Sequence, residues 1–267
     1  MRVVVRRFES GDTDAVERIN HRLERAANEH RVYPEDLSTN PDADLAIRPI
    51  NDSLFVATDG EEIRGGAWLR EQYFWVDGAR HRVGWLKYPV AESLIDPQYA
   101  GVPASMLMQL LRQQPHLMAL GMGGHDAPFA RLLAGIKWRS YTIPFLFRIS
   151  RPFNVLRGLS HARRRAWLRR LMDVAAWSGA GWVAHRALHA GTGRIGRSLT
   201  VTTEGAFAPW ADSVWEDCRD GYGALAVRDA KTLDFLYPSS YPNLHRLRVS
   251  RGGTDIGWVC GQILPPG

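Results

Sequence analysis

The sequence of 267 residues has little cysteine, little lysine and no long apolar segment. Its two cysteines, Cys218 and Cys260, are too few for a disulfide-rich secreted scaffold and cannot form a zinc site by themselves. No apolar run approaches the ~18 residues that a transmembrane helix needs. The N-terminal run Val3–Val5 is short and enclosed by arginines, which argues against a signal peptide. We therefore expect a cytoplasmic protein with reduced thiols and no bound metal.

Positive charge is in excess, and nearly all of it is arginine. Only three of the 34 basic residues are lysine (Lys87, Lys137 and Lys231), and the net charge is +6. Such a surface favours anionic partners, namely the phosphates of a cofactor, a nucleic acid or an anionic membrane. The hydrophobic fraction of 45% and the charged fraction of 23% are ordinary for a globular protein and argue against a disordered chain.

The first 150 residues alternate between strand and helix patterns. Apolar periodicity predicts a strand at 3–8, a helix at 10–30, strands at 53–58, 63–76 and 80–90, a helix at 104–113, a strand at 117–122, a helix at 129–136 and a strand at 141–149. The pairs Asp59-Gly60 and Asp77-Gly78 separate the three middle strands. An Asp-Gly pair favours a type I′ hairpin turn, because both of its central residues need a positive φ. The middle strands should therefore form an antiparallel meander.

This order of elements resembles the GNAT family of N-acyltransferases. The segment Pro97–Met108 stands where the family carries a proline, an aromatic residue, Arg/Gln-x-x-Gly-x-Gly/Ala and a Leu-Leu pair, and Ala130–Trp138 resembles its late helix that ends in Gly-Phe. The resemblance covers residues 1–150. It implies an α+β fold with a twisted, mostly antiparallel sheet flanked by helices. It also implies acetyl-CoA or another acyl-CoA as co-substrate and a small-molecule or peptide amine as acceptor, which attacks a thioester slotted between two splayed central strands.

The loop before the 104–113 helix is the part that the resemblance assigns to the cofactor. Backbone N–H groups at a helix N-terminus bind a pyrophosphate, and the helix dipole reinforces them. The resemblance places this role on five residues: Ala100, Gly101, Val102, Ala104 and Ser105.

The same loop departs from the family pattern. Ala100 takes the Arg/Gln position, and Pro103 replaces the first loop glycine and lacks an N–H. The tyrosine that often protonates the leaving thiolate falls near Leu133, which has no proton to donate. These departures leave an alternative open: a catalytically inactive GNAT-like module that binds a partner or a nucleotide-like ligand.

Candidate catalytic residues follow from the need for a base that takes a proton from the attacking amine. Glu92 comes directly after the third meander strand and is the first candidate, and Glu71 on the preceding strand is the second. Tyr99 and Tyr88 are candidate proton donors to the thiolate. In the pair His125-Asp126, Asp126 is expected to cap the following helix.

Residues 151–200 read as a basic helical linker, with a helix over 154–189. Arginines crowd its first part, Arg157–Arg170, which is compatible either with an amphipathic helix on an anionic membrane or with a bridging helix that has a solvated face. Nucleic acid is a less expected partner, because the sequence shows no RNA-binding strand signature or helix-turn-helix. Gly191–Gly196 matches Gly-x-Gly-x-x-Gly but lacks the preceding strand and following helix of a dinucleotide site, so we interpret it as a loop.

Residues 201–267 return to mixed patterns. They predict a strand at 199–203, a helix at 210–218, a strand at 225–228 and a hairpin of strands at 244–249 and 256–263. Three interpretations stay open. These elements form a partial second GNAT-like unit, they belong to a truncated piece, or they complete the first sheet. The sequence does not indicate the oligomeric state.

Overall fold

The computed structural model describes the greater part of the chain. The described residues are 3–32, 48–121, 124, 126–143, 170, 173–174, 198–241 and 243–262. The chain divides into two compact units, the first made of Met1–Arg139, Val201–Val249 and Asp255–Gly267 and the second of Ser140–Thr200 and Ser250–Thr254. The expected strand at 141–149, most of the basic helix with its Arg157–Arg170 cluster, and the Gly191–Gly196 loop lie outside the described residues. The boundaries expected at 150 and 200 stay predictions.

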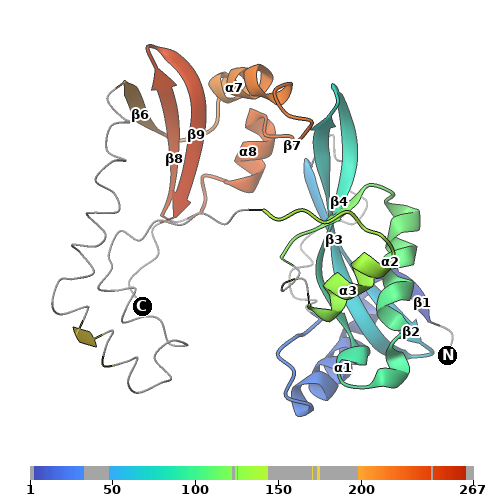
Figure 1. Cartoon of the computed structure of the whole chain (residues 1–267). Helices are drawn as coiled ribbons and strands as arrows, with labels where there is room; N and C mark the ends of the chain where they lie inside the picture. The colour runs from blue at the N-terminus through green and yellow to red at the C-terminus, as the bar shows by residue number, and fades with distance from the viewer. Residues whose placement is uncertain are drawn as a thin grey trace. The chain divides into compact units, whose positions relative to one another are not determined.

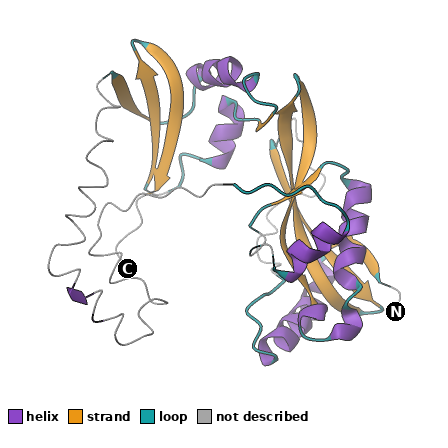
Figure 2. Ribbon diagram, viewed as in Figure 1, coloured by secondary structure: helices purple, strands orange, loops and turns teal. Residues whose placement is uncertain are grey.

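A six-stranded mixed sheet forms the centre of the first unit (Figures 1 and 2). Its strands are β1 (Val4–Arg7), β2 (Ile50–Asp59), β3 (Glu62–Val76), β4 (Ala79–Ala91), β5 (Leu117–Ala119) and β7 (Ala224–Ala226). The order is β1-β2-β3-β4-β5, antiparallel from β1 to β4, and β5 runs parallel to β4. The predicted meander and the predicted α+β fold class are thereby confirmed.

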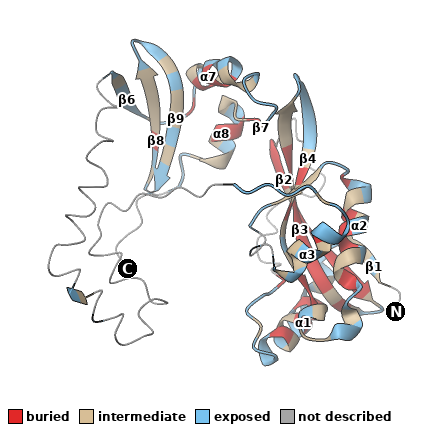
Figure 3. Ribbon diagram, viewed as in Figure 1, coloured by how far each residue is buried: buried red, intermediate tan, exposed pale blue. Residues whose placement is uncertain are grey.

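Helices cover both faces of this sheet. A 3₁₀ turn (Ser10–Asp12) leads into α1 (Thr13–Arg25), and the others are α2 (Val102–Gln113) and α3 (Pro128–Gly135). Leu54 and Val56 of β2 pack with α1 on one face, whereas Phe55 and Ala57 pack with α2 on the other. Figure 3 shows buried stretches of this sheet in red. Because side chains alternate along a strand, burial on both faces requires the continuous apolar run that β2 has. Among the described residues, no helix has the length and apolarity that crossing a bilayer requires.

The two Asp-Gly turns differ from each other. At the β3–β4 turn, Asp77 has φ 47° and Gly78 has φ 83°, so the predicted type I′ geometry is confirmed there. At the β2–β3 turn the loop residues are Gly60 and Glu61, and of these Gly60 alone has a positive φ, 64°. The type I′ prediction is wrong for this turn, since a positive φ at the first central glycine is typical of type II′.

Close packing of α2 against the sheet depends on two glycines. A Cβ on Gly65 would lie 2.8 Å from the carbonyl oxygen of Val90 and 3.0 Å from Sδ of Met106. A Cβ on Gly84 would lie 2.8 Å from Cγ of Gln114. The absence of both side chains therefore lets α2 lie directly on β3 and β4 along its length.

The C-terminal elements of the first unit add to this sheet and form another. They comprise β6 (Leu199–Glu204), α7 (Pro209–Arg219), β7, α8 (Ala230–Leu236), β8 (Leu244–Arg251) and β9 (Thr254–Gln262). The predicted strands and helix are all present. The sequence reasoning missed helix α8. Asp229 is the residue that could have indicated its start, because its side chain caps the helix by accepting a hydrogen bond from the Thr232 N–H at 2.9 Å.

The pairing of strand β7 bears on the expectation that this part of the chain completes the first sheet. β2 pairs with β3 only as far as Ile50↔Gln72, and β7 then covers the β3 edge from Phe74↔Ala226 to Val76↔Ala224. β7 thus completes the first sheet, whereas β6, β8 and β9 form a separate three-stranded sheet in the order β6-β8-β9. This arrangement of the described residues does not confirm a partial second GNAT-like unit.

Candidate functional site

A cavity of about 220 Å³ opens between the end of β4, the first turns of α2 and the start of α3. β4 contributes Leu86 and Val90, α2 contributes Met106 and Leu110, and α3 contributes Leu132 to its wall. None of the described residues that line it carries a charge. The cavity suits an elongated, largely apolar ligand segment.

The cavity lies where strand β4 extends beyond the end of its neighbour, strand β5. β5 pairs only with Gly84–Leu86, and β4 then continues to Ala91. The pairing of β3 with β4 steps from Trp68↔Lys87 to Gly66↔Val90, so Tyr88 and Pro89 form a bulge on β4. Tyr88 has φ 47°, and the next residue has no N–H to pair. The β4 residues Pro89–Ala91 that line the cavity therefore lie at the bulge and past the end of the β5 pairing.

The N-terminus of α2 stands beside this cavity, since Ala100 and Pro103 both line it. Asp96 accepts from the Gln98 N–H at 3.0 Å and caps the preceding 3₁₀ turn, Pro97–Tyr99. α2 then begins at Val102, with Gly101 at its N-cap position.

The five predicted cofactor-binding residues contribute unequally to this end of the helix. The N–H of Ser105 already donates to the carbonyl oxygen of Gly101 at 3.0 Å. The N–H groups of Val102 and Ala104 belong to the first turn of the helix, which has no intrahelical acceptor. Val102 as a whole residue is fully buried, so its N–H is covered by the core and is not offered to a ligand. The accessible residues that can offer a backbone N–H here are therefore Gly101 and Ala104.

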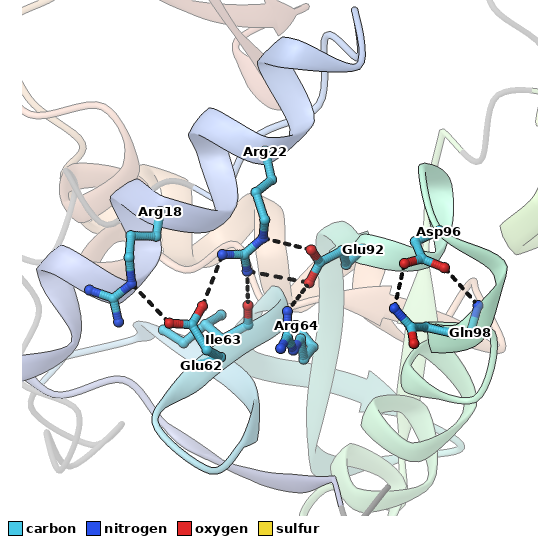
Figure 4. Close-up of polar contacts among 8 residues, drawn as sticks. All are labelled: Arg18, Arg22, Glu62, Ile63, Arg64, Glu92, Asp96 and Gln98. Carbon is cyan, nitrogen blue, oxygen red and sulfur yellow. Dashed lines mark hydrogen bonds and ion pairs between the residues drawn. The ribbon is translucent and has the colours of Figure 1, made fainter.

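Glu92, the first candidate base, lies in a buried ion-pair network rather than in the cavity wall (Figure 4). Its Oε1 accepts from Nε of Arg22 on α1 at 2.6 Å, and its Oε2 accepts from Nη1 of Arg64 on β3 at 2.9 Å. The Glu92 side chain is 5% exposed. Burial works against the charge of Arg64, but Glu92 more than offsets it, and the pKa of Arg64 is raised. The carboxylate thus ties α1, β3 and the end of β4 together.

The network continues toward solvent through Glu62. Arg22 also donates to Glu62 at 2.9 Å and to the carbonyl oxygen of Ile63 at 2.9 Å, and Arg18 donates to Glu62 at 3.0 Å. Burial disfavours the charged form of Glu62, but these arginines lower its pKa overall.

Glu71 and Tyr99 also face partners other than the cavity. Glu71 accepts from Nε2 of Gln114, at the end of α2, at 3.0 Å and forms an ion pair with Arg82. The Tyr99 ring lies 4.5 Å from the guanidinium carbon of Arg64. Arg64 therefore contacts both Glu92 and Tyr99, whereas Glu71 contacts Gln114 and Arg82 instead. The catalytic roles of all three residues stay predictions.

Two further residues singled out in the sequence are Leu133 and Asp126. Leu133 is buried in the core. Asp126 does not cap α3, so that prediction is wrong: Ala127 occupies the N-cap, Pro128 follows at the first helical position, and the Asp126 side chain is fully exposed. Among the described residues, no group of three or more His, Cys, Asp or Glu side chains is placed to hold a metal ion.

No family model matches this sequence, and no curated protein is found to be similar to it. Solved structures do match. A transcriptional regulator from Bacillus halodurans C-125 is 16% identical, with a TM-score of 0.38, over 55% of this chain and 100% of its own. A GNAT family acetyltransferase from Staphylococcus aureus is 12% identical, with a TM-score of 0.36, over 56% of this chain and 100% of its own. An acetyltransferase with acetyl-CoA from Clostridium acetobutylicum is 13% identical, with a TM-score of 0.34, over 55% of this chain and 96% of its own.

At these identities and TM-scores the likeness carries no argument about activity, and the fold is described from the strand order alone. The described part of residues 4–135 has the strand order and the helices on both faces that the resemblance to the GNAT family implied. Within it, the sequence reasoning located the α2 loop but missed the bulge at Tyr88 and Pro89. A proline inside a strand pattern is the signal that could have found it, because such a residue is confined to edges and bulges.

Proposed function

We propose that the GNAT-like part of this chain binds an acyl-CoA and transfers its acyl group to an amine. The observation that carries the proposal is the uncharged cavity at the point where β4 separates from β5, with the N-terminus of α2 at its mouth. An acyl-CoA has the matching polarity: an apolar acyl and pantetheine arm that ends in a pyrophosphate.

The residues present fit this donor in two ways. Met106, Leu107 and Leu110 offer an apolar wall for the arm. The N–H groups of Gly101 and Ala104, with the positive end of the α2 dipole, suit the pyrophosphate. Pro103 removes one donor from this cradle. The acceptor is a small-molecule or peptide amine.

The reaction needs one nucleophile and one proton transfer. The amine nitrogen attacks the thioester carbonyl carbon, the carbonyl oxygen becomes an oxyanion, and the C–S bond breaks as the amide forms. The amine proton is lost and the thiolate of CoA is protonated. Glu92 follows the cavity residue Ala91, so its predicted role as base remains a proposal to be tested separately from its ion pairs.

Calorimetric titration of the full chain with acetyl-CoA, a long-chain acyl-CoA and free CoA tests the proposal. We expect micromolar binding, and we expect Leu132→Trp, which fills the cavity, to weaken it at least tenfold. Met108→Trp is the matched control, because Met108 lies on the exposed side of α2 and is 47% exposed. No binding at millimolar ligand, or equal binding by both variants, would contradict the proposed cleft.

An inactive GNAT-like binding module is the second candidate, and the buried Leu133 together with Pro103 favours it. A thiol-release assay with a panel of amines separates the two. Release of free CoA that depends on the amine supports the transferase. Tight acyl-CoA binding without amine-dependent thiol release supports the module.

A further inference from the structure

A second cavity lies at the opposite end of the β3–β4 hairpin, where β7 joins the sheet. It measures about 480 Å³, and its lining includes Gln72, Arg80, Val227, Asp229, Lys231 and Thr232. Arg80 and the cleft residue Pro89 lie on the same strand, roughly 30 Å apart at ~3.3 Å per residue. This cavity is therefore separate from the proposed acyl-donor cleft.

Asp229 is the acidic residue that lines this cavity, and both of its carboxylate oxygens already accept hydrogen bonds from the protein. Oδ1 of Asp229 accepts from the Thr232 N–H at 2.9 Å, and Oδ2 accepts from Nη2 of Arg80 at 3.3 Å. Asp229 thus caps the first turn of α8 and forms an ion pair with one Nη group of Arg80. The remaining N–H groups of Arg80 are donors only.

Gln72 presents a further donor to the cavity. Its Oε1 accepts from Nη1 of Arg228 at 3.4 Å, and because a guanidinium has donors only, the amide oxygen has to face it. This contact is the only side-chain hydrogen bond of Gln72 among the described residues, so its Nε2 group remains available to donate. Gln72 itself is 6% exposed, which fixes the amide in place.

The positive charge behind Gln72 is not neutralised by the protein. Arg228 donates to the carbonyl oxygen of Val227 at 2.7 Å, and within the described part of the chain it forms no ion pair with a carboxylate. Burial lowers the pKa of the Arg228 guanidinium. A partly buried guanidinium without a counter-charge loses some of its hydration, and an anion bound nearby would compensate part of that cost.

We propose that this cavity binds a small molecule that carries an oxyanion, either a carboxylate or a phosphate. Gln72 and Arg80 donate hydrogen bonds to it, Lys231 adds positive charge at the wall, and Arg228 orients Gln72 from behind. Guanidinium and amide donors match the geometry of both oxyanions. The inference concerns a second ligand and does not depend on the proposed acyl transfer.

Titration calorimetry on the full chain tests this site with four probes: malate, citrate, inorganic phosphate and pyrophosphate. Ionic strength is kept constant with sodium chloride, so that general charge screening does not change between titrations. We expect saturable binding of at least one probe in the millimolar range or below. Tighter binding of the carboxylates or of the phosphates identifies which source of oxyanion the site takes.

Gln72→Glu is the decisive variant. It places a carboxylate beside Arg228, which supplies the missing counter-charge, and it sets a negative charge where the ligand should bind. We expect unchanged or higher thermal stability together with at least tenfold weaker anion binding. Arg80→Gln should weaken the binding as well. Arg131→Gln, which removes an exposed arginine on α3, should leave it unchanged.

Three results would overturn the proposal: no saturable binding of any probe, undiminished binding by Gln72→Glu, or an equal loss in the Arg131→Gln control. Titration of the Gln72→Glu variant with acetyl-CoA keeps the two sites apart. If acetyl-CoA binds that variant as it binds the unmodified chain, a loss of anion binding belongs to this cavity alone.

Discussion

Replacing Glu92 with glutamine separates the two roles considered for this carboxylate, base and structural anchor, because the amide keeps the size of the side chain and removes its charge. In the structure, Glu92 receives hydrogen bonds from Arg22 at 2.6 Å and from Arg64 at 2.9 Å. Without the carboxylate, Arg22 still has Glu62 and the carbonyl oxygen of Ile63. Arg64 keeps the Tyr99 ring, and its Nε is buried without a hydrogen-bond partner. Most of the cost therefore falls on Arg64.

The size of the effect follows from burial. Removing one partner of a fully buried ion pair costs roughly 3–5 kcal/mol. The side chains of Arg22 and Arg64 are 28% and 17% exposed, so water compensates part of the loss. We expect Glu92→Gln to reduce the free energy of unfolding by about 2–3 kcal/mol. For a chain of this size that corresponds to a drop in Tm of roughly 5–10 °C.

Urea and thermal unfolding measure this change, and Arg18→Gln provides the control. Arg18 belongs to the same network but is 48% exposed, and its Glu62 partner is 34% exposed. Exposed pairs of this kind contribute roughly 0.2–1 kcal/mol. The control should therefore change Tm by a small fraction of the Glu92→Gln shift.

Activity then distinguishes anchor from base. An anchor lowers kcat/KM with an unchanged pH profile, whereas a base removes the acidic limb of the profile. A Tm within about 2 °C of the unmodified chain would refute the buried-network reasoning. Loss of the acidic limb at unchanged Tm would instead establish Glu92 as the base.

Three further changes test the packing and the acid stability. Gly65→Ala should destabilise the chain by roughly 1–3 kcal/mol in urea and weaken acyl-CoA binding, because the new Cβ would lie 2.8 Å from the backbone oxygen of Val90. Gly78→Ala should cost about 1 kcal/mol in the same assay, since φ is +83° there and no atom crowds the position. The Arg6 guanidinium lowers the pKa of Asp12, so this stabilisation is complete above the unfolded value of about 3.9 and is lost as pH falls through the folded one. Asp12→Asn should therefore be less stable than the unmodified chain at pH 7 and match it near pH 2.

The sequence predicted best those elements whose conformation is determined by a few neighbouring residues. The hairpin between β3 and β4 follows from Asp77-Gly78, whose backbone preference acts whatever surrounds it. The start of α3 shows the limit of such reasoning. Asp126 is a favourable cap by residue type, but Pro128 takes the first helical position, and the cap then falls on Ala127.

The side-chain contacts of the candidate site could not be predicted from the sequence, because they join residues that are far apart along the chain. Glu92 meets Arg22 across 70 residues and Arg64 across 28, and no spacing rule connects such positions. The approach of Glu92 to two arginines depends on how α1 packs against β3. A carboxylate after a strand predicts a candidate base equally well whether it faces a substrate or an ion-pair network.

Both cavities arise from the same physical situation, a strand that extends past its neighbour. β4 continues to Ala91 after its pairing with β5 ends at Leu86, and the uncovered length opens onto the apolar cleft. β3 continues to Val76 after its pairing with β2 ends at Gln72, and β7 covers the exposed edge from Phe74 onward. An uncovered edge leaves backbone groups unpaired, so β7 satisfies that end of the hairpin. At the other end, no strand of the described chain covers the β5 side of β4 beyond Leu86, and the bulge at Tyr88 and Pro89 lies beside the apolar cavity.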